Sequence, residues 1–441
     1  RPPELHAALK PSTGDCGAQL TAGHRGATAT ELYFDLVYFM PLQRLSERAL
    51  DWDNIGDFWL YYIAVFNAWL GQTFFNNRFD TDDIVARLFA LAKMACVVMM
   101  AAGVPTDIAS EGGEVFIVSY CTLRLLLVVE YMRTARNVPE ASSLCLRFSL
   151  GFAAGTGCWL LSFATRRAST AATVACCVCG ACVEYATPFA LTLTGRMLPI
   201  HQGHLIERLC LFTVLATSVS MMVHNDRILL EYEALGEPFE AHEAARLAVC
   251  CFLGLVTPFS ILVLYTRGMA AFPSWPRMPV SGDDAPPAPE QPADGSLAAS
   301  GGDEVVPMRG AGTSTPQKLR TYACIYLHLP FTGAFASIAA GLEKMRCTAA
   351  TKTGPAEGAA ECEESSPLYF SGATGLTFIA LAVVHRAAGA TTVRCLARAV
   401  PGIFLLVIGA TVDTGCMKHL WIVAAVSFGA VLLDYTRAVT G

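Results

Sequence analysis

The stretch GEVFIVSYCTLRLLLVVEYM, residues 113–132, is long enough and apolar enough to cross a bilayer as a helix, because about 20 such residues span the hydrocarbon core. Arg124 lies near its middle. A guanidinium cannot shed its charge, and a charge at membrane depth persists only when it is paired or faces a wet cavity. The stretch therefore predicts a membrane-spanning helix with a charged inner face.

Eleven further apolar stretches of similar length run along the chain. Each must be a helix, because lipid offers no partners to backbone N–H and C=O groups. We predict an all-α, polytopic transmembrane bundle of about 12 spans. The other expected spans are 31–50, 57–75, 84–104, 143–164, 170–193, 204–223, 245–265, 320–342, 368–386, 395–413 and 415–436.

The composition agrees with a membrane protein. Hydrophobic residues make up 54% of the chain and charged residues 15%, and the mean hydropathy is +0.44. The net charge of −6 excludes the basic footprint of a nucleic-acid-binding protein. Residues 1–30 contain no apolar core of a signal peptide, so we interpret them as an N-terminal cytoplasmic tail.

A polar segment divides the predicted spans. Eight of them fall within residues 31–265 and four within residues 319–441. Residues 266–318, which include GDDAPPAPEQPADGSLAASGGDE, hold too little apolar surface to fold. We predict a disordered cytoplasmic linker there, and a regulatory tether that binds a protein partner stays open.

Loop charges orient the bundle, because loops rich in Lys and Arg stay cytoplasmic. Alternate loops are basic, which places both termini in the cytoplasm. Arg166 and Arg167 depart from the pattern, since they fall in an outer loop. The residues that carry the bias are Lys10, Arg25, Arg133, Arg136, Arg267, Arg277, Lys318, Arg386, Arg394 and Arg398.

The first span begins with ELYFDLVYF, in which Glu31 and Asp35 are four residues apart. This spacing puts both carboxylates on one helix face. Two carboxylates so close together should not both be ionised in a low-dielectric interior, so the pair could carry a proton or bind a cation. Alternatively they cap the start of the helix, with help from Thr28 or Thr30.

The turn NNRFDTDD, residues 76–83, holds Arg78, Asp80, Asp82 and Asp83. Asp80 or Thr81 could cap the following helix, with the acids near its positive end. Asp83 would reach Arg87 one turn further along the helix. So many charges in a short turn also suit an ion-pair gate, and both interpretations stay open.

Four further spans contain ionisable groups. Arg124 should pair with a carboxylate, and we expect Glu31, Asp35 or Glu207. Glu184 precedes Pro188 by four residues, so its carbonyl has no helical N–H partner, which is typical of a polar pathway.

The motif HLIERL places His204, Glu207 and Arg208 within about one helical turn. In YLHLP, His328 lies two residues before Pro330. It is either a packed, hydrogen-bonded histidine or part of a proton relay.

The cysteines point to structure rather than to metal binding. Cys347 and Cys362 fall in one predicted outer loop. They could form a disulfide there or remain free thiols, and both interpretations stay open. The group of cysteines in the sixth predicted span has no nearby histidine and is interpreted as packing. We predict neither a metal nor a cofactor. The cysteines of that group are Cys176, Cys177, Cys179 and Cys182.

Several motifs together resemble the bacterial low temperature requirement A (LtrA) proteins. They are ELYFDLVY, NNRFDTDD, HLIERLCLFT, YLHLPFTGAFASIAAGLE and PLYFSG, in the family's order. After LFT, however, the chain reads VLATSVSMM where the family has a Gly-Glu pair, and FSILVLYT replaces an aromatic stretch. The resemblance implies a multi-pass membrane protein tied to growth in the cold.

A weak internal symmetry is also visible. ELYFDLVYF of the first span resembles ERLCLFTVL of the seventh, and Ala-Ala-Gly recurs at 101–103 and 339–341. The pattern indicates two six-helix repeats of parallel topology, an arrangement found in transporters with sites at the repeat interface.

We therefore expect a transporter or an ion/proton pathway for an unknown small solute or ion. The alternative is a membrane scaffold or sensor whose buried ion pairs are structural. An enzyme is not expected, since the sequence has no HExxH, GxSxG or P-loop. The lipid bilayer is the predicted partner, nucleic acid is not, and a homo-oligomer stays open.

Overall fold

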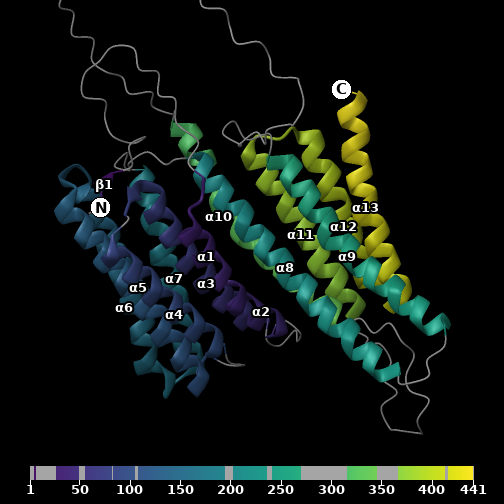
Figure 1. Ribbon diagram of the computed structural model, residues 1–441, viewed down its shortest axis with the longest axis horizontal. Helices are drawn as coiled ribbons and strands as arrows, with labels where there is room; N and C mark the ends of the chain where they lie inside the picture. The colour runs from purple at the N-terminus through teal and green to yellow at the C-terminus, as the bar shows by residue number, and fades with distance from the viewer. Residues whose placement is uncertain are drawn as a thin grey trace, which may run out of the picture.

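The structure, a computed structural model, confirms an all-α polytopic bundle (Figure 1). It describes residues 4–5, 26–48, 55–81, 83–104, 108–193, 202–235, 241–269, 315–344, 366–412 and 416–440. The helices are α1 (Ala29–Val37), α2 (Phe39–Arg48), α3 (Ile55–Arg78), α4 (Ile84–Ala102), α5 (Glu111–Asn137), η3 (Pro139–Ala141), α6 (Ser142–Arg166), α7 (Thr170–Leu193), α8 (Gln202–Leu235), α9 (Ala241–Met269), α10 (Thr315–Lys344), α11 (Ser366–Ala388), α12 (Thr392–Thr411) and α13 (Cys416–Thr440).

Ten of these helices, α4 to α13, are long and apolar enough to cross a membrane among the described residues. The predicted first span is divided into α1 and α2 at Tyr38. Pro41 explains the break, because it has no N–H to donate to the carbonyl four residues earlier. Near the α3 end, β2 (Phe79–Asp80) pairs antiparallel with β1 (Glu4–Leu5).

Helix α3 runs through the middle of the first half. Nearly all of its side chains from Phe58 to Arg78 are buried, and it contacts α2, α5, α7, α8 and α10. A helix covered on all sides need not be apolar on any lipid face. This position explains why α3 can carry a series of amide and aromatic side chains at membrane depth.

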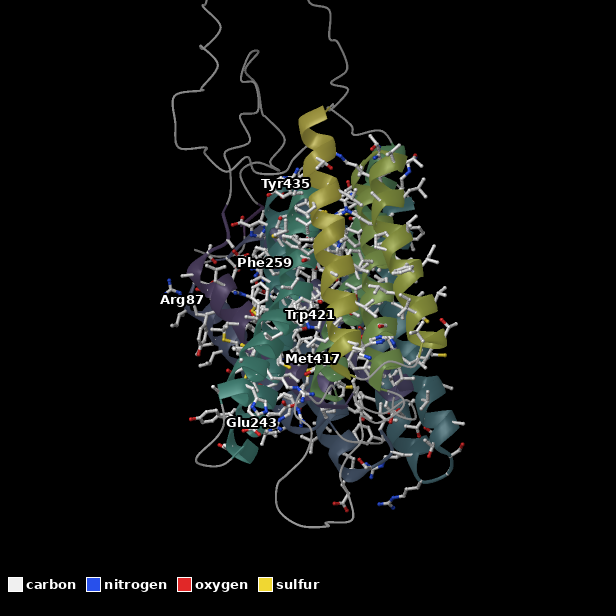
Figure 2. All side chains as sticks on the ribbon, turned by 90° about the vertical axis from the view of Figure 1, so that its right-hand side faces the viewer. Arg87, Glu243, Phe259, Met417, Trp421 and Tyr435 are labelled. Carbon is white, nitrogen blue, oxygen red and sulfur yellow. The ribbon has the colours of Figure 1, made fainter. Side chains whose placement is uncertain are left out.

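Apolar side chains cover the outer surface of the bundle. Phe259 is 56% exposed and Trp421 is 52% exposed, and both project from the middle part of the helices in Figure 2. Tyr435 and Glu243 lie toward opposite ends in the same view. An apolar surface of this extent suits contact with lipid.

The two halves of the bundle repeat one packing plan. In the first half, α2 contacts α3 and α4, α3 contacts α5 and α7, and α4, α5, α6 and α7 pack in sequence. In the second half, α8 contacts α9 and α10, α9 contacts α11 and α13, and α10 to α13 pack in sequence. The neighbours correspond when α1 and α2 count as one span. This agreement supports the two parallel repeats suggested by the sequence.

The interface between the halves is formed by their first helices. Helix α8 contacts α1, α2 and α3, and α10 contacts α2, α3 and α7. In Figure 1, α8 crosses between the first seven helices and the group of α9 and α11 to α13. Polar side chains on α1, α3 and α8 therefore meet at the repeat interface.

The segments that flank the helices differ slightly from prediction. Helix α9 continues to Met269 and α10 begins at Thr315, so both ends of the predicted 266–318 linker are helical. Residues 270–314 lie outside the described residues. Arg166, one of the two arginines that depart from the charge pattern, is the last residue of α6 and forms an ion pair with Glu114 of α5. The pairing neutralises one of the two basic residues there.

Candidate functional site

Helix α1 begins with a capping box that fixes the position of Glu31. The side chain of Thr28 accepts a hydrogen bond from the Glu31 backbone N–H at 3.2 Å, and the Glu31 carboxylate accepts from the Thr28 N–H at 2.9 Å. This reciprocal arrangement satisfies two donors at the helix start. The capping interpretation is therefore confirmed for Glu31 with Thr28, but Asp35, one turn further along the helix, takes no part in the cap.

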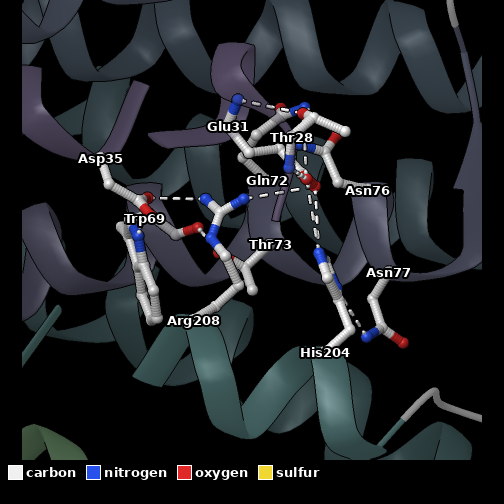
Figure 3. Close-up of polar contacts among 10 residues, drawn as sticks. All are labelled: Thr28, Glu31, Asp35, Trp69, Gln72, Thr73, Asn76, Asn77, His204 and Arg208. Atoms are coloured by element: carbon white, nitrogen blue, oxygen red, sulfur yellow. Dashed lines mark hydrogen bonds and ion pairs between the residues drawn. The ribbon is translucent and has the colours of Figure 1, made fainter. Parts of the chain in front are cut away.

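Arg208 of α8 bridges the two carboxylates of α1 (Figure 3). Its Nη2 lies 2.6 Å from Asp35 Oδ1, and its Nη1 lies 3.2 Å from Glu31 Oε1. The Trp69 indole also donates to Asp35 Oδ1 at 2.6 Å. All four side chains are buried. The predicted shared face of α1 thus becomes an ion-pair contact between the two halves of the chain.

His204 joins this cluster one turn before Arg208. Its Nε2 lies 3.4 Å from Glu31 Oε2, and its Nδ1 lies 3.2 Å from Asn77 Nδ2 (Figure 3). His204 therefore lies between the Asn77 amide and the Glu31 carboxylate, and Nε2 is the ring nitrogen that can donate to that carboxylate.

A second buried cluster contains two residues that the sequence analysis missed, Lys93 and Glu130. Lys93 Nζ of α4 lies 2.5 Å from Glu130 Oε2 of α5 and 2.5 Å from Gln72 Oε1 of α3. Gln72 Nε2 donates in turn to Asn76 Oδ1 at 2.8 Å. The signal was present in the sequence, since Lys93 is the one charge in the apolar run LFALAKMACVV.

A polar cavity connects the two clusters. Its volume is about 290 Å³, enough for several water molecules. Glu31, Glu130 and Arg87 line it, and the exposed side chain of Arg87 projects from the outside of the bundle in Figure 2. The other polar lining residues are Thr28, Thr30, Gln72, Asn76 and Thr81. Two carboxylates from different helices therefore face a cavity that water can fill.

Arg124 pairs with a carboxylate as predicted, but the partner is Glu184 rather than Glu31, Asp35 or Glu207. Arg124 Nε lies 2.9 Å from Glu184 Oε2, and the Tyr120 hydroxyl donates to the same oxygen. The cavity beside the pair has a volume of only about 10 Å³, room for about one water molecule. We therefore assign this pair to a structural link between α5 and α7, which both pack against α6.

The charged turn before α4 separates into different environments. Arg78 is buried and donates to the Phe74 carbonyl at 3.0 Å and to the Tyr322 hydroxyl at 3.3 Å. Among the described residues no carboxylate forms an ion pair with it. The side chain of Asp80 and all of Asp82 lie outside the described residues.

Asp83 is the N-cap of α4 and accepts from the Ala86 N–H at 2.7 Å. The expected partner Arg87 is not the one found, because the carboxylate forms its ion pair with Arg133 of α5. The hydrogen bond from Arg133 lowers the pKa of Asp83 below its ordinary value. This contact ties the start of α4 to the end of α5, outside the membrane-spanning segment.

Two predicted site residues lie apart from both clusters. Glu207 is half-buried, and its Oε2 has no hydrogen-bond partner in the described part of the chain. His328 donates through Nδ1 to the Cys324 carbonyl at 2.6 Å and accepts at Nε2 from the Tyr265 hydroxyl at 3.0 Å. Both ring nitrogens are satisfied, which fits a packed histidine in the second half.

The remaining predicted features concern cysteine and metal. Cys347 and Cys362, the predicted disulfide pair, lie outside the described residues. Within the described ranges, no group of three or more His, Cys, Asp or Glu side chains is arranged to hold a metal ion.

Comparison with known proteins supports the resemblance over the part of the chain that holds ELYFDLVY, NNRFDTDD and HLIERLCLFT. The family model described as "Bacterial low temperature requirement A protein (LtrA)" matches residues 26–269, more than half of the chain. The chain belongs to the LtrA family. Its match includes every helix that lines the polar cavity.

One curated relative of this LtrA protein comes from Rhizobium meliloti (strain 1021) and carries the name "Uncharacterized protein RA0937". It is 22% identical over 324 residues, which cover 71% of this chain and 68% of the relative. No solved structure matches the chain.

Proposed function

We propose that this LtrA protein is a transporter or ion pathway that moves protons or small cations through the cavity lined by Glu31 and Glu130. The observation that carries the proposal is this polar cavity of about 290 Å³ inside a membrane-spanning bundle. Ionisable groups at membrane depth that face a water-filled space mark ion and proton pathways. Ionisable side chains that only hold helices together would not need a cavity large enough for water.

Carboxylates and fixed cations are equal in number at the cavity. Glu31, Glu130 and Arg87 line it, and Asp35, Arg208 and Lys93 lie behind the lining in contact with these carboxylates or with each other. Three acids thus face three cations, and the site carries no net charge from them when all three acids are ionised. A proton would therefore bind Glu31 or Asp35 in competition with Arg208.

Arg78 is a further buried cation that lies apart from the cavity lining. Its guanidinium lies over the rings of Phe74 and Phe148, at 5.4 and 5.5 Å from their centroids. It makes no ion pair with the carboxylates of the cavity. Aromatic rings and polar oxygens therefore stabilise this charge, and the cavity acids do not pair with it.

The location of the cluster suits alternating access. Glu31 and Asp35 belong to the first helix of the first repeat, and Arg208 and His204 belong to the first helix of the second. Transporters built from repeats place their sites where the repeats meet and move one repeat against the other. Protonation of Glu31 or Asp35 would weaken its bond to Arg208 and loosen this contact.

The test is flux through purified protein in liposomes with a trapped pH dye and an imposed ion gradient. We expect Asp35→Asn and Glu31→Gln to abolish flux while the protein stays folded. The matched control is Glu140→Gln, which removes an exposed carboxylate in η3. Wild-type protein that moves neither protons nor common cations would overturn the proposal, as would variants that keep full flux.

A membrane scaffold or sensor is the second candidate. The observation that favours it is that Glu130 and Glu184 each contact a buried cation, an arrangement that could serve packing alone. Under this alternative, the wild-type protein moves neither protons nor common cations, and Asp35→Asn lowers its thermal stability.

Three further points belong to the proposal. The role is non-catalytic, both termini are cytoplasmic, and the activity contributes to growth under low-temperature stress. The loop charges support the orientation. The name of the family, low temperature requirement A, supports the link to growth in the cold.

A further inference from the structure

A groove of about 730 Å³ lies between α10, α11 and α12, in the second half of the bundle. The polar cavity lies in the first half. Most of its wall is apolar and includes Leu327, Ile379, Val383 and Leu396. Val383 and Leu396 are exposed, with 43% and 55% of their surface accessible. Because these helices are long and apolar enough to cross the membrane, the open side of the groove faces lipid.

The groove has a basic end. Arg320 is the first residue of the membrane-spanning part of α10, and Arg386 lies in the last turn of α11. Both line the groove and both are exposed. Neither forms an ion pair with a described residue. Arg386 Nη1 donates a long hydrogen bond to the Ala390 carbonyl at 3.4 Å. Two guanidinium groups that have no ion-pair partner in the described part of the chain therefore lie at one end of the apolar groove.

The start of α12 adds to this positive end. Thr392 lines the groove and is the first residue of the helix. The first N–H groups of a helix and its dipole attract negative charge. The end of α11, the start of α12 and the start of the α10 span thus come together at one membrane boundary.

We propose that this groove binds an anionic phospholipid. The phosphate lies between Arg320 and Arg386, and an acyl chain follows Leu327, Ile379 and Leu396 into the membrane. Charge complementarity selects the ligand, because two guanidinium groups without a carboxylate partner among the described residues suit a phosphate. Basic pockets between membrane helices bind anionic headgroups. The bilayer itself supplies such a lipid at the open side.

The test uses the full-length protein in phosphatidylcholine nanodiscs, with and without phosphatidylglycerol, and measures thermal unfolding and the lipids retained in native mass spectrometry. Phosphatidylglycerol should raise the unfolding midpoint of the wild type and should be retained. Because one basic residue near anionic lipid changes affinity about fivefold, Arg320→Gln with Arg386→Gln should weaken retention about 30-fold.

Two matched variants separate the groove from general surface charge. Arg394→Gln removes an exposed arginine from the first turn of α12 that does not line the groove, so it should keep the phosphatidylglycerol effect. Ala399→Trp fills the apolar wall with a large ring and should abolish the effect with both arginines present.

Three results would overturn the proposal. The first is a wild-type midpoint that does not respond to phosphatidylglycerol. The second is an equal loss of lipid in Arg394→Gln and in the double arginine variant. The third is a full effect of soluble glycerol phosphate, which would show that an anion without acyl chains is sufficient. None of these outcomes depends on ion flux.

Discussion

The Arg124–Glu184 pair offers a quantitative prediction about stability, because it joins α5 to α7 through a contact with almost no solvent. Arg124 Nε lies 2.9 Å from Glu184 Oε2. At an effective dielectric constant of about 20, opposite charges at this distance attract by about 6 kcal/mol. Removal of one partner from a buried pair costs about 3–5 kcal/mol, because the other charge is left without compensation.

The two single substitutions should not be equal. Arg124→Met leaves Glu184 with the Tyr120 hydroxyl as a donor, and a carboxyl group can take up a proton, so we expect a loss of about 3 kcal/mol. Glu184→Met leaves a guanidinium that cannot become neutral. Its remaining support is the Tyr120 hydroxyl at 3.2 Å and the Phe152 ring at 4.9 Å. We expect a loss of about 5 kcal/mol.

The double variant Arg124→Met/Glu184→Met should lie within about 2 kcal/mol of the wild type, because apolar side chains of similar size often replace a buried ion pair without loss. The measurement is equilibrium unfolding in mixed micelles, followed by circular dichroism, for all four proteins. The reasoning is refuted if Arg124→Met costs more than Glu184→Met, or if the double variant costs the sum of the two.

Three other predictions concern separate parts of the molecule. Asp83→Asn keeps the helix cap but loses the ion pair to Arg133, which should lower the stability by about 0.5–1 kcal/mol. Because the pKa of Asp83 is lowered in the folded state, this difference from the wild type should be constant above about pH 5. It should shrink in thermal melts as the pH falls below about 4. Gly402→Ala should cost about 1–3 kcal/mol, since its new Cβ would lie 2.7 Å from the Gly375 carbonyl oxygen, whereas Gly372→Ala, with open space around the new Cβ, should be neutral. Glycosylation tags near residues 235 and 290 should be modified only at 235, and modification at 290 alone would reverse the proposed orientation.

The sequence predicted the helices well because lipid imposes a simple rule on them. Each of the twelve predicted spans corresponds to a helix or, for 31–50, to the pair α1 and α2. The break at Tyr38 was missed, although Pro41 marks it in the sequence. An apolar run shows that the chain crosses the membrane, but it does not show that the helix is continuous.

The partners of the charges were harder to predict, because they depend on which helices become neighbours. Glu31, Asp35, His204 and Arg208 were each singled out, yet only the fold brings α1 against α8. The expected partners of Arg124 were wrong for the same reason, since α5 packs closest to α6 and reaches Glu184 on α7.

Lys93 was missed for a different reason, because its signal lay in the sequence. It stands alone in an apolar span, as Arg124 does, and the rule applied to Arg124 would have identified it. Glu130 shares the span of Arg124 and follows it by six residues, which places the two side chains on different faces of α5. A polar group on each face of one helix indicates two separate contacts.

The most direct test of whether the buried charges work in transport uses the Lys93→Leu/Glu130→Leu variant, with stability and ion flux measured on the same preparation. Replacement of both partners should leave the stability within about 2 kcal/mol of the wild type. The control is Arg124→Met/Glu184→Met, whose cavity of about 10 Å³ is too small for a pathway. We predict that the Lys93/Glu130 variant folds but conducts no more than protein-free liposomes, while the control keeps its flux. A folded Lys93/Glu130 variant with wild-type flux would contradict the proposal and assign the pair to packing.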